Sequence, residues 1–362
     1  MKVSLVLRAV GVAAVAAVGL TACGSNSNGG TSNGTGGSSS GCPSGTVTGQ
    51  GSTFQQSMEQ QWISQYTGQC SGAHITYTGV GSGAGIQQFG SGTTDYAGSD
   101  VVMISTEQAA ADKACGSPAI HLPITAGGIA LIYNVKGVSN LQLSAPTIAK
   151  IFTGKIKTWD DAAIKADNPG VQLPATAVKS YHRADSSGTT GVFSGFLDAV
   201  AKSDWSLGAN KELSWPAGQA ATGSDGVTAG VKATDGGITY AEISYAKQSN
   251  LPTAKVKGVG SGYIDLTGAT VAQSLDTGFS VTGTGNNLAG ALDFTKMQGY
   301  PISTVSYVIV CSKYSDATKG KVIKGLLDYA IGSGQGQADA LGFAPLPTAL
   351  AAKSKQSIDS IS

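Results

Sequence analysis

Three loops rich in glycine and serine place the strongest constraint on how this chain can fold. Each loop follows an apolar, strand-like run and precedes an amphipathic, helix-like run; they span residues 49–53, 79–83 and 182–189. Glycine lets the backbone come close to a ligand, and the first N–H groups of a helix have no partner within the helix. With the positive end of the helix dipole, such helix starts suit phosphate or a similar oxyanion. The repeated strand–turn–helix order predicts α/β layers with parallel sheets.

Composition and charge exclude several kinds of partner. The chain has 362 residues, which at ~150 residues per domain predicts two domains. Its formal net charge is +1 and only 12% of its residues are charged, which argues against a nucleic acid partner because binding to phosphate backbones needs a basic surface. The loops do not match GxxxxGK[ST], and no acidic residue follows at the spacing of a dinucleotide-binding fold, so nucleotide chemistry is disfavoured.

The N-terminal residues 1–22 are predicted to be an export signal. Two basic residues are followed by an uncharged run of 14 residues, too short for a membrane span of ~20 but typical of a secretory signal. The segment Leu20–Cys23 is similar to the lipobox of bacterial lipoproteins, which implies cleavage before Cys23, diacylglycerol on its sulfur and a second acyl chain for firm anchoring. The alternative is an ordinary signal peptide followed by a cysteine.

The residues after Cys23 are predicted to be a tether. All 18 residues from Gly24 to Gly41 are Gly, Ser, Asn or Thr, a composition from which no core can form. A flexible chain of this length spans roughly 23–25 Å. Residues 23–41 are therefore expected to be a lipidated, flexible linker. Removal of the signal leaves 21 basic against 22 acidic residues, with Arg183 as the single arginine.

The remaining cysteines favour disulfides over metal ligation. An even number in an exported chain predicts two disulfides, with three possible connectivities, and four buried free thiols are the alternative. No CxxC motif is present, and the three histidines lie far apart without HxH or HExxH spacing, so we expect neither a metal site nor a cofactor. The four cysteines are Cys42, Cys70, Cys115 and Cys311.

The loop sequences and their surroundings resemble a known family, the phosphate-binding proteins of bacterial high-affinity phosphate ABC transporters. The resemblance runs from about Thr46 to the C-terminus. One departure is Gln55, which stands where proline is common in the family. The stretches that carry the resemblance are GQGSTF (49–54), GVGSGAGIQQF (79–89), TTDYAGSD (93–100), IAKIFTGKIKTWDDAAI (148–164), HRADSSGTT (182–190) and ALGFAPLPTAL (340–350).

The resemblance implies an α/β fold of the two-lobe, type II periplasmic-binding-protein class, with mixed sheets, crossover hinge strands and a ligand cleft between the lobes. Two long apolar runs, 120–133 and 305–311, are expected to be the crossovers. This places residues 42–126 and 303–362 in lobe 1, and residues 127–302 in lobe 2.

The same strand order predicts the disulfide pairing. Cys42 and Cys70 precede the first two strands, whose starts meet if the strands are parallel neighbours. Cys115 precedes one crossover and Cys311 ends the other, and an antiparallel pair would align them. We therefore expect the disulfides Cys42–Cys70 and Cys115–Cys311.

The resemblance also implies a set of residues around the anion. Asp185 would orient Arg183, and Asp100 would touch the anion and admit only a ligand that carries a proton. Alternatives remain: Thr53 and Asp185 could be helix caps, Ser82 a turn residue, Arg183 a surface ion pair, and Asp100 could pair elsewhere. The expected phosphate ligands are Thr53, Phe54, Ser82, Asp100, Arg183, Ser187, Gly188 and Thr189.

The function implied is that of a non-enzymatic, monomeric receptor. It would capture inorganic phosphate outside the cytoplasm, attached to the cell membrane only through its lipid anchor, and deliver the anion to the membrane permease of an ABC transporter. A secreted phosphomonoesterase is one alternative, but the sequence lacks the activated nucleophile or metal cluster that hydrolysis needs. A binder of another tetrahedral oxyanion, such as sulfate or molybdate, is the other.

Overall fold

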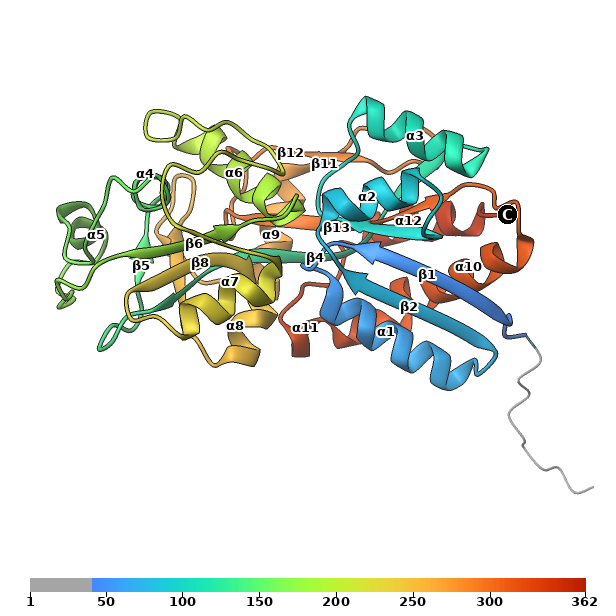
Figure 1. Cartoon of the computed structure of the whole chain (residues 1–362), viewed down its shortest axis with the longest axis horizontal. Coiled ribbons are helices and arrows are strands. Elements are labelled where there is room, and N and C mark those ends of the chain that lie inside the picture. Colours follow the sequence, from blue (N-terminus) through green and yellow to red (C-terminus); the bar gives the residue numbers. More distant parts are fainter. Residues whose placement is uncertain (1–40) are drawn as a thin grey trace, which may run out of the picture. The chain divides into compact units, whose positions relative to one another are not determined.

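The computed structural model describes residues 41–362 (Figure 1). The predicted signal peptide, the lipidation site Cys23 and the tether up to residue 40 lie outside the described residues. None of the helices within 41–362 combines the length and apolar character needed to cross a bilayer.

A mixed eleven-stranded sheet forms the framework, in the order β2-β1-β3-β13-β4-β8-β6-β7. In addition, β9 pairs with β4, and β5 and β10 pair with β9. The strands β1, β2 and β3 are parallel, and so are β6, β7 and β8, whereas β13 and β4 run antiparallel to their neighbours. The α/β class is confirmed, and the sheet is mixed as the family resemblance implies, not parallel throughout as the repeated units alone suggest.

The strands of this sheet are β1 (Gly45–Gly51), β2 (Ala73–Gly79), β3 (Tyr96–Ser99), β4 (Ala119–Asn134), β5 (Gln142–Leu143), β6 (Lys179–Arg183), β7 (Gln219–Ala221), β8 (Gly237–Glu242), β9 (Thr253–Lys257), β10 (Tyr263–Ile264) and β13 (Ser303–Cys311). A separate antiparallel pair consists of β11 (Phe279–Val281) and β12 (Gly290–Leu292).

Helices pack against these strands because each carries an apolar face. The first helix buries Met58, Trp62 and Tyr66, the stripe at four-residue spacing that the sequence shows. The helices are α1 (Gln56–Gln69), α2 (Ser82–Gly90), α3 (Ser105–Cys115), α4 (Ala145–Phe152), α5 (Ala162–Asp167), α6 (Gly188–Val200), α7 (Gly223–Lys232), α8 (Ile243–Ser249), α9 (Gly268–Gly278), α10 (Ala317–Ile331), α11 (Ala338–Leu341) and α12 (Thr348–Asp359), with a 3-10 helix at Ser333–Gln337.

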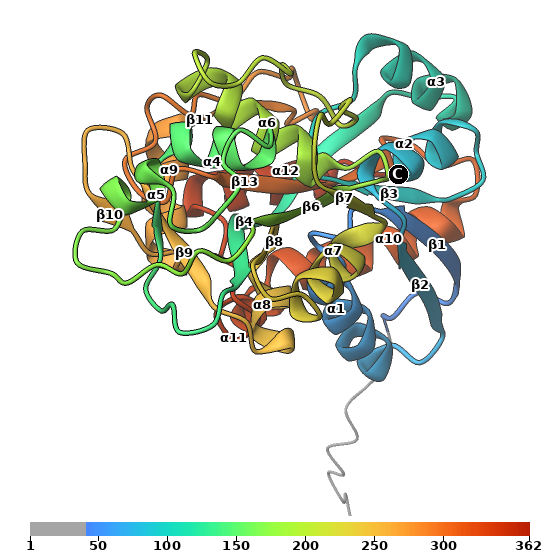
Figure 2. The same cartoon turned by 60° about the vertical axis from the view of Figure 1, so that its left-hand side comes forward.

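The two apolar runs expected to be crossovers form β4 and β13. Residues 119–128 of β4 pair with β13, and residues 129–134 pair with β8, so one continuous strand joins the β1–β3 part of the sheet to the β6–β8 part. Both strands are buried along nearly their whole length, which explains why most of their residues are apolar. Figure 2 shows β1 and β2 to the right of β4, and β9 and β10 to its left.

The predicted lobe boundaries stay a prediction. One contact bears on where lobe 2 ends: the amide of Leu288 donates to the carbonyl of His121 at 2.9 Å, and the His121 amide donates to the Asn287 side chain at 3.0 Å. Residues near 287 therefore pack on the half of β4 that pairs with β13.

Burial lowers the pKa of His121 to about 4, so its ring is neutral at physiological pH and accepts from the Met103 amide.

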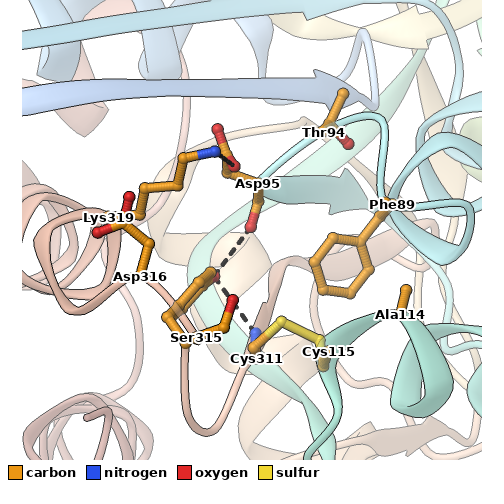
Figure 3. A pocket seen from close by; sticks show the side chains of 11 residues that line it. Phe89, Thr94, Asp95, Ala114, Cys115, Cys311, Ser315, Asp316 and Lys319 are labelled. Atoms are coloured by element: carbon orange, nitrogen blue, oxygen red, sulfur yellow. Dashed lines mark hydrogen bonds and ion pairs between the residues drawn. A yellow bond between two sulfur atoms is a disulfide. The ribbon is translucent and has the colours of Figure 1, made fainter.

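The structure contains both expected disulfides, Cys42–Cys70 and Cys115–Cys311. The first joins the residues before β1 and β2, and the second joins the end of α3 to the end of β13. Figure 3 shows the second disulfide in the wall of a pocket that is also lined by Phe89 and by the Lys319–Asp95 ion pair. The alternative of four free thiols is therefore wrong.

The Cys115–Cys311 disulfide is expected to stabilise the protein more than Cys42–Cys70. The two bridges close loops with sequence separations of 196 and 28 residues. In the chain-entropy model they contribute about 5 and about 3.5 kcal/mol to the free energy of unfolding. Urea unfolding of the Cys115→Ser/Cys311→Ser and Cys42→Ser/Cys70→Ser double variants measures both losses. Equal losses, or a larger loss from the shorter loop, would contradict this ranking.

Candidate functional site

Four helix starts meet where the two parts of the sheet face each other. The turn before α1 contacts the start of α7, since Thr53 Oγ1 lies 2.8 Å from Ser224 Oγ. The start of α6 contacts the residue after β3, because Thr189 Oγ1 donates to Asp100 Oδ2 at 3.3 Å. The start of α2 joins them, since Ser82 Oγ accepts from the Asp100 amide at 3.3 Å. The topology therefore gathers all three glycine-rich loops at one place.

Backbone donors at this place are free to bind an anion. The amides of Thr53, Ser82, Gly188 and Thr189 donate to no other group within residues 41–362. All four residues are buried. Buried N–H groups without a partner are costly, so a cluster of them indicates an acceptor that binds there. Helix starts supply such donors, together with the positive end of the dipole.

Arg183 lies buried at the end of β6 and is held by its neighbours. Its Nε donates to Asp185 Oδ1 at 2.8 Å, Nη2 donates to Asp185 Oδ2, and Nη1 donates to Ser224 Oγ at 3.2 Å. Burial by itself raises the pKa of Asp185, but the Arg183 guanidinium outweighs it and lowers that pKa overall. Arg183 is buried rather than part of a surface ion pair. Asp185 pairs with it and also accepts from the amide of Gly223, the first residue of α7, at 3.0 Å. This bidentate pairing of one carboxylate with the guanidinium fixes the orientation of the guanidinium plane.

Asp100 is almost completely enclosed, with 2% of its surface exposed. Its Oδ1 accepts from the hydroxyls of Ser52 at 2.6 Å and Ser306 at 2.7 Å, and its Oδ2 receives only the long contact from Thr189. Burial raises the pKa of Asp100, against the opposing effect of the Ser52 and Ser306 hydrogen bonds and of Arg183. Oδ2 therefore has capacity to accept a further hydrogen bond.

The remaining expected ligands have other partners. Ser187 is the N-cap of α6, because its Oγ accepts from the Thr190 amide at 3.1 Å, which ties its side chain to the helix. The Phe54 amide donates to Ser52 Oγ at 3.0 Å, so this expected ligand donor is already used. Thr53 does not cap α1: Gln55 stands at the N-cap position, and no side-chain cap bond is present there.

Further residues of the site were missed from the sequence. Ser52 and Ser306 hold Asp100, Ser224 lies between Thr53 and Arg183, and the Tyr245 hydroxyl donates to the Thr53 carbonyl at 2.7 Å. A signal for Ser224 exists, since residues 222–226 read TGSDG at the start of α7, a glycine- and serine-rich stretch like the other three loops.

At Gly188, the first residue of α6, the backbone comes very close to Ser82 of α2 and to Asp100. A Cβ on Gly188 would lie 2.3 Å from Ser82 Oγ and 2.9 Å from Asp100 Oδ2, inside van der Waals contact. Only glycine allows α6 to come this near to α2 and Asp100.

Replacement of Gly188 by alanine is expected to weaken phosphate binding by about 1–3 kcal/mol, because the added methyl forces Ser82 and Asp100 apart. Calorimetric titration of the variant with phosphate measures the loss. Gly226→Ala in α7 is the matched control, since its Cβ would meet no atom nearer than 3.5 Å. Alanine favours helix at both positions, and thermal unfolding of both variants separates lost binding from lost stability. Equal affinity in the two variants would contradict the close approach.

The site presents hydrogen-bond donors and one positive charge, which is the chemistry of anion binding. Within residues 41–362, no group of three or more His, Cys, Asp or Glu side chains is arranged to hold a metal ion. His182, the first residue of the third loop, stacks on Trp215 with ring centroids 4.8 Å apart.

Comparisons with known proteins agree with this geometry. A family model described as a PBP superfamily domain matches residues 36–333. The chain is 38% identical to phosphate-binding protein PstS 3 of Mycobacterium leprae over 96% of each chain. It is also 38% identical to phosphate-binding protein PstS 2 of Mycobacterium tuberculosis over 98% of each.

Solved structures share the fold. The phosphate-bound periplasmic protein PfluDING superposes with a TM-score of 0.70 at 24% identity, covering 86% of this chain and 93% of that one. A phosphate-binding protein from Stenotrophomonas maltophilia superposes with a TM-score of 0.69 at 22% identity, with the same coverage. Because relatives at 38% identity match along nearly the whole length, the chain belongs to the PstS family of phosphate-binding proteins.

Proposed function

We propose that the protein captures inorganic phosphate outside the cytoplasm and delivers it to the membrane permease of an ABC transporter. The observation that carries this proposal is the cluster of unpartnered amides from Thr53, Ser82, Gly188 and Thr189 beside the buried guanidinium of Arg183. Together they offer directed donors and one full positive charge to a small tetrahedral oxyanion. The PstS relatives support phosphate as that anion.

Asp100 favours phosphate over sulfate. An ionised carboxylate only accepts hydrogen bonds, so a buried one gains from a ligand that brings a proton. Phosphate near pH 7 carries at least one O–H, whereas sulfate would place bare oxygen charge against Asp100 Oδ2. Such a repulsive contact in a desolvated site discriminates strongly between two anions of similar shape.

Binding followed by release requires the two parts of the site to separate. The site takes its residues from two parts of the chain. Thr53, Ser82 and Asp100 come before β4 in the sequence, whereas Arg183, Gly188 and Thr189 come after it. We infer that residues 42–126 with 303–362 and residues 127–302 move as two lobes about β4 and β13. Two contacts would break when the lobes separate. They are the ion pair between Glu107 of α3 and Lys211, and the backbone hydrogen bond from the Gly83 amide to the Ser186 carbonyl at 2.9 Å.

The membrane anchor is part of the same proposal. A lipidated Cys23 with the linker up to residue 41 would hold a monomeric receptor beside its permease while leaving it free to turn. The protein would act without catalysis, because the site supplies donors and a positive charge but no activated nucleophile.

Calorimetric titration with phosphate, sulfate and a phosphate monoester tests the proposed function. We expect tight binding of phosphate and much weaker binding of sulfate. We also expect weaker binding of the monoester, because its additional group would have to fit between Gly188 and the nearby Ser82 and Asp100 side chains. A parallel assay of p-nitrophenyl phosphate measures hydrolysis, and robust turnover by the purified protein would overturn the receptor proposal in favour of a phosphatase.

A further inference from the structure

Behind Asp100 lies a second carboxyl group that the anion site itself does not use. Glu59, on the first turn of α1, is connected to Asp100 through Gln55 and Ser306. Gln55 Nε2 lies 3.1 Å from Glu59 Oε1, Gln55 Oε1 lies 2.6 Å from Ser306 Oγ, and Ser306 Oγ lies 2.7 Å from Asp100 Oδ1. None of these four side chains is more than 2% exposed. The chain of contacts therefore runs through the protein interior from α1 to the anion site.

The hydrogens available along this chain do not suffice if both carboxyls are ionised. Ser306 has one hydroxyl hydrogen, but its Oγ faces three acceptor oxygens: Gln55 Oε1, Asp100 Oδ1 and, at 3.4 Å, the Ser99 carbonyl. The neighbouring Ser52 hydroxyl is already committed, since it donates to Asp100 Oδ1 and accepts from the Phe54 amide. One additional proton is needed to satisfy both short contacts of Ser306.

Two arrangements supply that proton. In the first, Glu59 is protonated and donates to the Gln55 oxygen, the Gln55 amide turns so that its NH2 donates to Ser306, and Ser306 donates to an ionised Asp100. In the second, Glu59 is ionised and accepts from Gln55, Ser306 donates to Gln55, and Asp100 must be protonated to donate to Ser306. Both arrangements hold one proton between the two carboxyls, and the amide and hydroxyl reverse together.

We propose that Gln55 and Ser306 form a hydrogen-bonded relay in which a proton held on Glu59 keeps Asp100 ionised and able to accept a hydrogen bond from the bound anion. Glu59 and Gln55 are thereby positioning residues for the selectivity of the site. The proposal rests on the proposed function, since it concerns how Asp100 recognises a protonated oxyanion.

The surroundings favour the proton on Glu59. Burial raises the pKa of Glu59 to about 8, against the opposing effect of the Gln55 and Tyr96 side chains. Its Oε2 accepts no hydrogen bond within the described residues. The ionisable groups that face it are the phenols of Tyr77 and Tyr96, which supply no positive charge. Asp100 is also buried, but the Ser52, Ser306 and Thr189 hydroxyls and Arg183 favour its ionised form, with Tyr77 and Tyr245 as the other ionisable neighbours.

The relay makes phosphate binding depend on pH with a definite sign. When Glu59 ionises above about pH 8, Gln55 must donate to it, and Asp100 then loses the Ser306 donor or takes up a proton. Either change weakens its contact with a ligand O–H. Binding therefore requires Glu59 to be protonated, so affinity falls as the pH rises through the pKa of Glu59.

The test is calorimetric titration with phosphate between pH 6.5 and 9.5, comparing wild type with Glu59→Gln. Glutamine has the shape of the protonated acid, donates to Gln55 and cannot ionise. We expect wild-type affinity to fall about thirtyfold more than that of the variant between pH 7 and 9.5, the ratio of the protonated fractions of a group with a pKa of about 8. Titration of phosphate itself affects both proteins equally and cancels in this comparison.

Two further variants separate the relay from a structural role. Gln55→Met breaks the connection but leaves the Glu59 carboxyl. Like Glu59→Gln, it is expected to lack the additional fall in phosphate affinity that wild type shows with rising pH. Glu242→Gln is the matched control: burial raises the pKa of Glu242 to about 8 as well, but this residue caps α8 through the Ser244 amide and has no contact with the relay. Its profile should follow wild type.

The outcomes distinguish the two levels of the proposal. A wild-type protein that binds no phosphate at any pH overturns the proposed function and the relay with it. Phosphate binding with one pH profile shared by all four proteins overturns the relay alone.

Discussion

Arg183→Ala is expected to weaken phosphate binding by at least ~1.5–3 kcal/mol, the scale of a charge-assisted hydrogen bond. Arg183 is the one positively charged side chain among the site residues, and its position is fixed by Asp185 and Ser224. Its loss also leaves the Asp185 carboxylate half-buried without its cation, which adds repulsion against an incoming anion. Calorimetry at constant ionic strength measures the change in Kd.

Two controls sharpen this test. Lys136→Ala removes an exposed ion pair with Asp235 and should leave the Kd unchanged. Wild-type affinity should vary little with salt, because the guanidinium lies in a site that solvent ions do not enter. An Arg183→Ala variant that binds phosphate as tightly as wild type would remove this residue from the site.

Asp100→Asn is expected to narrow the preference for phosphate over sulfate by about ten- to a hundredfold, which is the worth of one hydrogen bond to a charged group. The amide can donate as well as accept, so it no longer repels an anion without a proton. Phosphate affinity falls and sulfate affinity rises. The ratio of the two calorimetric Kd values measures the change.

The matched control for this change is Asp95→Asn. Asp95 lies five residues earlier in the chain and pairs with Lys319 at 2.7 Å, away from the anion site. Its replacement also removes one carboxylate but should leave the phosphate-to-sulfate ratio unchanged. If Asp100→Asn behaves like Asp95→Asn, the selectivity does not come from Asp100.

Local sequence patterns predicted the elements well because each carries its own signal. The apolar runs that became β4 and β13 are buried on both faces, and a doubly buried strand is mostly apolar. The helix starts at Ser82 and Gly188 follow glycine- and serine-rich turns, so both helix starts could be located to within one turn.

The partners of those residues could not be predicted in the same way. Ser306 reaches Asp100 from the middle of β13, 206 positions later in the chain, and nothing in its local sequence marks it as different from a core strand residue. Glu59 reads as a polar position on an amphipathic helix, yet the fold buries it. Such contacts depend on the order of strands in the sheet, which local periodicity does not contain.

The central claim is that Arg183, Asp100 and the helix starts around them form a single phosphate site. A crystal structure of the protein with phosphate tests it most directly. We predict one phosphate within hydrogen-bond distance of the Arg183 guanidinium and of the Ser82, Gly188 and Thr189 amides, with one of its oxygens donating to Asp100 Oδ2. A phosphate bound elsewhere on the protein, with these groups unoccupied, would contradict the account.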